Sequence, residues 1–140
     1  MITIDQVWEV KLFVPGLPAA QGSKRHVGGG RLVEQSKAVG PWRTVIAWHM
    51  ARVWKQALLG GPVTVALDFV MPRPKATPKR FTPAAVKRPD IDKLERAVFD
   101  ALTGIVWKDD SQVIRVLASK RIAELGEVSG VLIRIGTEEW

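Results

Sequence analysis

Residues 63–122 limit the possible folds most strongly, because they predict two strands joined by a helix. Residues 63–70, VTVALDFV, place apolar side chains at alternate positions, which is the pattern of a β-strand. Residues 90–103 place them three or four positions apart, which predicts an amphipathic helix, and residues 112–122 alternate again. A strand, helix and strand in this order form a right-handed crossover with both strands in one sheet.

The rest of the chain adds a strand before and after this unit, a hairpin and a second helix. These elements are predicted at residues 6–14 (strand), 24–27 and 31–34 (a hairpin around Gly28–Gly30), 41–58 (helix) and 129–136 (strand). We expect the last two strands to pair with each other as a hairpin. The predicted architecture is α/β: a single domain over residues 1–140, with a mixed β-sheet and two helices packed on one face.

The helix predicted at residues 41–58 carries Trp42, Trp48 and Trp54. A spacing of six residues does not keep side chains on one face of a helix. We interpret Trp48 and Trp54 as packing residues of the core or of a dimer. Stacking on DNA bases is the alternative that the sequence leaves open.

The composition favours an anionic partner and a cytoplasmic location. The 140 residues carry a formal net charge of +7 and a sequence pI of about 10.1, which favours nucleic acid. No cysteine is present for a disulfide or a thiolate metal site. The first ten residues lack the basic and apolar regions of a signal peptide. No apolar run approaches the roughly 20 residues of a membrane span, so no membrane partner is expected.

Four aspartates flank the predicted helix of residues 90–103. Asp90 and Asp92 lie at its start, and Asp109 and Asp110 lie just before the following strand. Mg²⁺ prefers a few hard oxygen ligands and keeps water molecules that substrate oxygens displace. Two or three of these carboxylates would suit it, and a third can reach the helix start if the strand packs beside the helix. The alternatives are ordinary helix capping for the first pair and a plain turn for the second.

A proline-rich segment at residues 71–89 leads directly into these acidic positions. From Arg73 to Lys93 the chain has seven basic and two acidic residues, a net charge of +5. A long cationic loop at an acidic site is what a DNA clamp needs, although a solvated linker would have the same composition. We expect contacts to phosphates, which position DNA without reading its bases. The predicted DNA-binding residues are Lys24, Arg25, Arg73, Lys75, Lys79, Arg80, Lys87 and Arg88.

Three blocks of sequence carry a resemblance to a known family. They are Pro89-Asp90-Ile91-Asp92-Lys93-Leu94, Asp100-Ala101-Leu102-Thr103-Gly104 and Trp107-Lys108-Asp109-Asp110-Ser111-Gln112-Val113. In this order they resemble the signature of the RusA family of Holliday-junction resolvases. These are small, dimeric, Mg²⁺-dependent endodeoxyribonucleases, often encoded by phages or prophages. The resemblance implies a RusA-like fold, a homodimer and a branched DNA substrate.

The resemblance also implies that Asp90, Asp92 and Asp110 bind Mg²⁺, with Mn²⁺ as an alternative ion. Two positions differ from the family's pattern. Lys93 stands where the family usually has asparagine, and Arg96 stands where the family has its catalytic lysine. Arginine keeps the positive charge but stays protonated, so it cannot carry a proton. The cationic catalytic role is therefore assigned to Arg96 or Lys93.

From these features we expect a Mg²⁺-dependent, structure-specific endodeoxyribonuclease that resolves Holliday junctions in DNA recombination and repair. The enzyme would act as a homodimer in the cytoplasm of a bacterial or phage-infected cell. Two alternatives stay open. One is a non-catalytic basic DNA-binding protein, whose aspartates only cap and turn. The other is a metal-dependent nuclease for other branched DNA, such as flaps or forks.

Overall fold

The computed structural model of the chain describes residues 7–22, 24–26, 32–34 and 37–137. Its main sheet has four strands in the order β1-β6-β4-β5, and β2 and β3 form a separate hairpin. The strands are β1 (Val10–Pro15), β2 (Lys24–His26), β3 (Leu32–Glu34), β4 (Val63–Met71), β5 (Val113–Ile122) and β6 (Gly130–Thr137). The helices are α1 (Val39–Val53), α2 (Ile91–Leu102) and the 3₁₀ turn η1 (Asp110–Gln112). The predicted Gly28–Gly30 tip of the hairpin lies outside the described residues.

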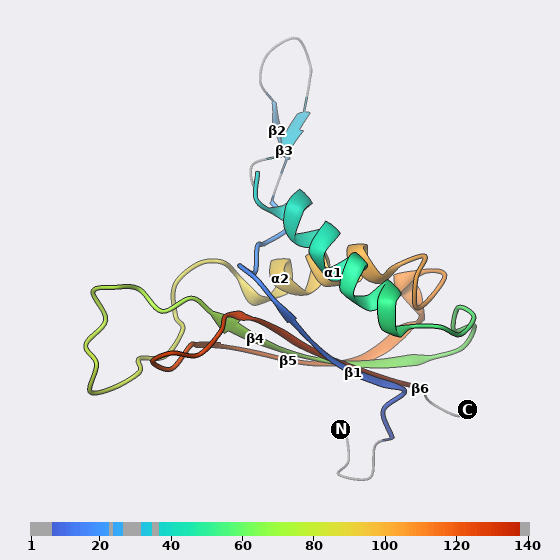
Figure 1. Cartoon of the computed structure of the whole chain (residues 1–140). Helices are drawn as coiled ribbons and strands as arrows, with labels where there is room; N and C mark the ends of the chain where they lie inside the picture. Colours follow the sequence, from blue (N-terminus) through green and yellow to red (C-terminus); the bar gives the residue numbers. More distant parts are fainter. Residues whose placement is uncertain (1–6, 23, 27–31, 35–36, 138–140) are drawn as a thin grey trace.

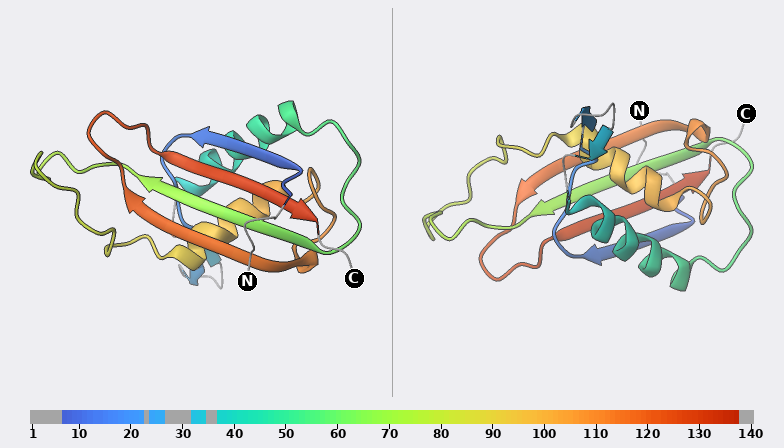
Figure 2. Two further views of the ribbon diagram at one scale, coloured as in Figure 1. Left: turned by 90° about the horizontal axis from the view of Figure 1, so that it is seen from below. Right: turned by 90° about the horizontal axis from the view of Figure 1, so that it is seen from above.

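Both α1 and α2 lie across the same face of the four-stranded sheet (Figures 1 and 2). Seen from below in Figure 2, no helix of the described residues covers the opposite face. β4 pairs parallel with β5 and antiparallel with β6, so the sheet is mixed. The predicted α/β class, with two helices on one face of a mixed sheet, is confirmed. Within the described ranges, no helix is long and apolar enough to span a membrane.

β4 is the central strand of the core. It lies between β5 and β6, and all its side chains except Asp68 are buried. The alternating residues that the sequence assigned to one face belong to the core that the helices cover: Val63, Val65, Leu67 and Phe69. Burying an apolar side chain of this size stabilises a fold by about 1.5–3 kcal/mol. β4 is therefore paired on both edges and covered on its apolar face in the folded chain.

α2 joins β4 to β5 as the predicted crossover. Its apolar stripe is confirmed, because Leu94, Val98 and Leu102 are fully buried. The helix ends at Thr103, whose hydroxyl accepts a 2.9 Å hydrogen bond from the indole N–H of the fully buried Trp107. The chain then enters β5, which runs parallel to β4. α2 therefore returns along the sheet in the direction opposite to both strands.

The prediction that the last two strands pair with each other is wrong. β6 pairs with β1 on one side and β4 on the other, so β4 separates it from β5. A hairpin between β5 and β6 would have left the second edge of β4 without partners for its backbone groups, which is costly in a buried strand. β6 begins at Gly130, where a Cβ atom would collide with the carbonyl oxygen of Val14.

The first helix is shorter than predicted and packs through a different face. It ends at Val53, because Trp54 is already extended (φ −86°, ψ 99°). Trp54 is buried, as expected for a packing residue. Trp48 is 56% exposed, with the Arg52 guanidinium 4.6 Å from its ring centre, so its assignment to the core is wrong. Its alternative assignment to a dimer interface stays a prediction. The buried side chains of α1 are Val39, Trp42, Ile46 and Met50.

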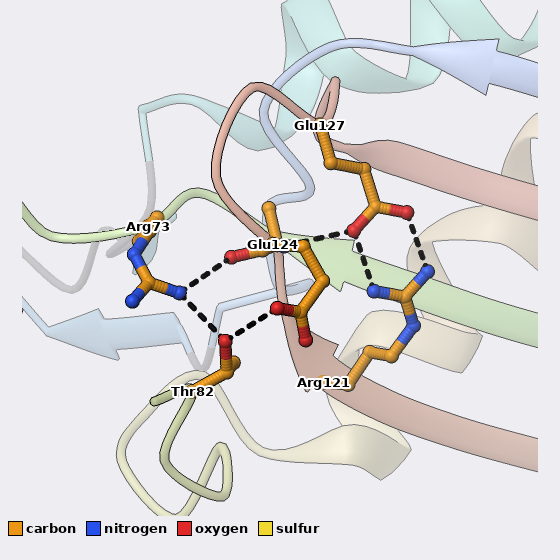
Figure 3. Close-up of polar contacts among 6 residues, drawn as sticks. Arg73, Thr82, Arg121, Glu124 and Glu127 are labelled. Atoms are coloured by element: carbon orange, nitrogen blue, oxygen red, sulfur yellow. Dashed lines mark hydrogen bonds and ion pairs between the residues drawn. The ribbon is translucent and has the colours of Figure 1, made fainter. Parts of the chain in front are cut away.

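A polar network joins the proline-rich loop to the connection between β5 and β6 (Figure 3). Arg73 donates hydrogen bonds of 2.6–3.2 Å to Thr82 Oγ1 and to the carbonyl oxygens of Pro78, Phe81 and Ala123. The Thr82 hydroxyl in turn donates to the Glu124 carboxylate at 2.7 Å. The loop is therefore folded around one guanidinium group and tied to the sheet.

In the same network, Arg121 and Glu127 form an ion pair with two hydrogen bonds of 2.6 Å (Figure 3). Glu127 also accepts a 2.9 Å hydrogen bond from the backbone N–H of Glu124. The bonds from Arg121, followed by the one from Glu124, lower the pKa of Glu127 to about 2. This carboxylate therefore stabilises the β5–β6 connection only while it is ionised.

Replacing Glu127 with Gln should reduce the acid sensitivity of the fold. Because the folded-state pKa is depressed, the stabilisation is complete above the ordinary value of 4.5 and is lost as the pH falls toward 2. The melting temperature of the parental chain should therefore fall more steeply across this range than that of Glu127→Gln. The exposed Glu9→Gln should keep the parental slope. Equal slopes for the parental chain and Glu127→Gln would show that the ion pair does not form in solution.

Candidate functional site

The start of α2 presents two exposed carboxylates. Asp90 is the N-cap residue (φ −71°, ψ 142°), and Asp92 lies in the first turn. The Asp90 side chain makes no capping hydrogen bond. The capping interpretation is therefore not met at Asp90, because its oxygens are not used by the amides of the first turn. Both carboxylates lie where the helix dipole stabilises negative charge.

Glu95 is a further acidic residue near this helix start that the sequence analysis did not single out. It follows Asp92 by three residues, a spacing that places the two side chains on neighbouring parts of the helix surface. The pKa of Glu95 is raised, mainly by burial and further by the negative charge of Asp92. Glu95 and Asp92 therefore bring two acidic groups close together near the helix start.

The Asp90–Asp92 pair fits a hard divalent cation. Mg²⁺ is usually bound in enzymes by one or two carboxylates, with water molecules and substrate phosphates completing its octahedral shell. Among the residues that the structure describes, no group of three or more His, Cys, Asp or Glu side chains could hold a metal ion. If Asp90 and Asp92 were metal ligands, they would therefore leave most of the shell to other groups.

The two aspartates before β5 differ from each other. The Asp109 carboxylate accepts a 2.9 Å hydrogen bond from the Ser111 N–H and caps η1, and this bond lowers the pKa of Asp109. Asp110 is exposed at the first position of η1. The turn interpretation is therefore correct for Asp109. Gln112 fixes the turn through hydrogen bonds of 2.7–3.0 Å with the amides of Lys108 and Asp109 and the carbonyls of Leu59 and Gly61.

Asp110 and the Asp90–Asp92 pair lie at opposite ends of α2 (Figure 2). Because α2 runs against β4 and β5, its first turn lies beside the end of β5 and its last turn beside the start. The 12 residues of α2 span about 18 Å. The expectation that β5 brings a third carboxylate to the helix start is therefore not met within one chain. β5 does pack beside α2, but the start of β5 lies beside the last turn of the helix rather than beside its first turn.

Lys120 is a positioning residue that the sequence analysis missed. Its half-buried ammonium group donates hydrogen bonds to the carbonyl oxygens of Lys87 (2.8 Å) and Pro89 (2.7 Å). These carbonyls lie on either side of Arg88, directly ahead of Asp90. Lys120 therefore fixes the path of the chain into the site. The sequence signal was a lysine on the face of β5 that otherwise carries apolar side chains.

Most predicted DNA-binding residues are exposed on the loop between β4 and α2, which extends past the end of the sheet (Figure 1). The exposed ones are Lys75, Lys79, Arg80, Lys87 and Arg88. Arg73 differs, because it is half-buried and its guanidinium group folds the loop through hydrogen bonds to the carbonyl oxygens of Pro78 and Phe81. Its side chain therefore has a structural role whether or not it also contacts DNA.

The hairpin that carries Lys24 and Arg25 begins close to the same helix start. Both residues lie in β2. The preceding segment is tied to α2 by a 3.0 Å hydrogen bond from the Gln21 N–H to the carbonyl oxygen of Lys93. The hairpin and the cationic loop therefore both lead away from the first turn of α2.

The two candidates for the cationic role also lie at this end of α2. Lys93 is half-buried in the first turn, and Arg96 is exposed one turn further on. Arg96 follows Asp92 by four residues, so the two lie on the same side of the helix. Asp100, another four residues on, lies 3.8 Å from Arg43 of α1.

A family model described as Endodeoxyribonuclease RusA matches residues 15–135, which include both helices and all the aspartates discussed above. The chain belongs to the endodeoxyribonuclease RusA family. The uncharacterized protein YqaN of Bacillus subtilis (strain 168) is also similar, with 29% identity over 136 residues, covering 89% of this chain and 95% of YqaN. The family resemblance is thus confirmed, and membership in the RusA family implies endodeoxyribonuclease activity.

Lys120→Met should disturb the site more than its effect on stability suggests. The change leaves two carbonyl groups without their charged donor, which costs about 1–3 kcal/mol. A shift of about 1 Å at Asp90 would lower DNA cleavage by about 100-fold. Lys120→Arg should restore most of the activity, and Lys55→Met, at an exposed lysine, should change neither property.

Thermal melting, single-turnover cleavage and the Mg²⁺ concentration for half-maximal cleavage measure these effects. Lys120→Met should need more Mg²⁺ than the parental chain if Lys120 positions Asp90. An unchanged Mg²⁺ requirement in a variant that melts early would reduce Lys120 to a purely structural residue.

Proposed function

We propose that this member of the RusA family is a divalent-metal-dependent endonuclease that resolves four-way DNA junctions during recombination and repair. The observation that carries the proposal is the exposed Asp90–Asp92 pair at the start of α2. A basic chain places these carboxylates at the end of its cationic loop, and Asp90 does not use its side chain for capping. In a DNA-binding protein without catalysis, these carboxylates would stabilise the start of α2 but would repel the phosphates of the bound DNA. The site of action would be the bacterial or phage-infected cytoplasm.

Asp90 and Asp92 would hold Mg²⁺ or Mn²⁺ through their carboxylate oxygens. When bound, such a cation supplies Lewis acidity toward the scissile phosphate and lowers the pKa of an attacking water. The chain's own residues orient the DNA around this point. The exposed lysines and arginines of the loop hold phosphates on either side of the cut, and Arg96 or Lys93 neutralises charge that grows on the phosphoryl oxygens.

Asp110 would complete the site from a second copy of the chain. Its separation from the Asp90–Asp92 pair by the length of α2 prevents a shared site within one chain. In a homodimer, the helix start of one subunit can meet the β5 start of the other. The proposal therefore joins the predicted three aspartates with the predicted homodimer, and each subunit would contribute to both active sites.

Mixing two inactive variants tests this arrangement. Asp92→Asn and Asp110→Asn should each abolish Mg²⁺-dependent cutting of a labelled four-way junction while preserving the melting temperature. A heterodimer of the two has one site with both changes and one site with none. Mixing the variants under conditions that exchange subunits should therefore restore cleavage. Each heterodimer should have up to half of the activity of a parental dimer, because one of its two sites is intact. A site built from one chain would leave every site damaged.

The matched control for Asp110 is its neighbour. Asp109→Asn keeps a side-chain oxygen that can cap η1, so it should leave both the fold and junction cleavage close to those of the parental chain. Three-way, flap and linear duplexes in the same assay compare the junction with other DNA shapes. Parental rates of junction cleavage in both Asp92→Asn and Asp110→Asn would refute the proposed active site.

The cationic role is decided by substitutions at two positions. If Arg96 acts as a fixed positive charge, Arg96→Lys should retain substantial cleavage, whereas Arg96→Met should lose about 10²–10³-fold in rate. Lys93→Met should then have a small effect. Cleavage rates in saturating Mg²⁺, with junction affinity in EDTA as the binding control, separate the two residues. A larger loss for Lys93→Met would transfer the role to Lys93.

A further inference from the structure

A groove of about 660 Å³ opens between the proline-rich loop and the ends of β4 and β5. Met71, Ile122 and Pro18 line it from the sheet and from the segment after β1. The remaining lining residues belong to the loop and are mostly prolines and alanines. The groove is within the size range of ligand pockets and is mainly apolar, as such pockets usually are.

Two side chains hold the walls of this groove in place. Arg73 folds the outer part of the loop through its hydrogen bonds to Pro78 and Phe81. Lys120 holds the part that leads into α2, through the carbonyls of Lys87 and Pro89. The loop prolines further restrict the backbone. A groove whose walls are fixed before binding loses little conformational entropy when it is occupied.

The chemistry of the groove changes toward the candidate active site. Lys87, Arg88 and Pro89 line that end, and the next residue along the chain is Asp90, with adjacent Cα atoms about 3.8 Å apart. The occupant therefore meets an apolar interior and two cationic side chains. A nucleotide has this combination, because its base is flat and largely apolar on its faces and its phosphate is an anion.

We propose that this groove binds an unstacked nucleobase of the strand that is cut, while Lys87 and Arg88 contact the phosphate beside it. The inference rests on the proposed nuclease function, since the strand reaches the groove only if its scissile phosphate lies at Asp90 and Asp92. Taking a base out of a stack costs free energy in a duplex, and it costs least where stacking is already interrupted. The groove would therefore favour DNA that is cut next to a branch point over a continuous duplex.

The test combines groove-filling variants with DNA that lacks one base. Ala76→Leu and Ala84→Leu add bulk at two exposed positions of the groove wall. The cut position is first mapped in Mg²⁺, and an abasic nucleotide is then placed on either side of it. Affinity for the junction is measured in EDTA, so that no DNA is cut.

The parental chain should lose about tenfold in affinity when the base that enters the groove is removed. Each leucine variant should lose about tenfold on the intact junction and nothing further on the abasic one, because both changes remove the same contact. 2-Aminopurine at the same nucleotide should become brighter with the parental chain and not with the variants. Ala57→Leu, which adds the same bulk at an exposed position before β4, should behave as the parental chain does.

Three outcomes would overturn the inference. If the loss of affinity caused by a leucine variant and the loss caused by the missing base multiplied when both were present, the base and the groove would act independently. If both leucine variants kept the parental affinity for the junction but sedimented as assemblies of a different mass, the groove would be assigned to a second copy of the chain. An abasic scan without effect on the parental chain would exclude a bound base even if a variant failed to fold. If the parental chain still cuts junctions in Mg²⁺ in any of these three cases, only the groove inference fails and the proposed function stands. A parental chain that neither binds nor cuts junctions would overturn both the groove inference and the proposed function.

Discussion

The burial of β4 is the constraint on which the rest of the structure depends. A strand whose side chains are nearly all buried must satisfy its backbone groups on both edges, and β5 and β6 do so. α2 brings β5 to one edge by a crossover, so β6 has to take the other. β1 then extends the sheet from β6, and α1 covers the remaining apolar surface beside α2. The positions of the candidate aspartates at the two ends of α2 follow from this order.

The same crossover determines where the carboxylates can meet. A helix that joins two parallel strands runs against both, so residues just before the helix and residues just after it are a helix length apart. Asp90 and Asp110 are separated in this way, although they belong to one continuous signature in the sequence. The arrangement gives the proposed homodimer a chemical purpose, because a single chain has its carboxylates at two distant points. It also explains why the aspartates of the family signature are close together in the sequence but far apart in the structure of one chain.

Local patterns in the sequence were sufficient for much of the fold. The alternation of Val63, Val65 and Leu67 and the helical stripe from Leu94 to Leu102 each reported a buried face directly, so both elements and the crossover were predicted. The pairing of β6 was not predictable in this way, because strand order depends on which edge of β4 stays free. The assignment of Trp48 to the core was wrong for a similar reason, since hydrophobicity alone does not say which side of α1 faces the sheet.

For the site, the sequence located the acidic residues but not their environments. It could not distinguish Asp109, which caps η1, from Asp110, which is exposed, because the two are adjacent and chemically identical. Lys120 was missed because its partners are carbonyl groups from a segment some thirty residues earlier in the chain. Contacts of this kind depend on the tertiary path of the backbone, which no local pattern records.

The contacts of Arg73 have a consequence for how the cationic loop responds to its surroundings. Its guanidinium group is bound to carbonyl oxygens and a hydroxyl rather than to carboxylates. Dissolved ions screen attraction between exposed charges, but they weaken such short, partly buried hydrogen bonds far less. The loop should thus keep its shape at ionic strengths that release it from DNA. If the loop binds DNA as proposed, salt would weaken its contacts with phosphates and leave its own fold in place, so the protein could release one substrate and bind the next without refolding.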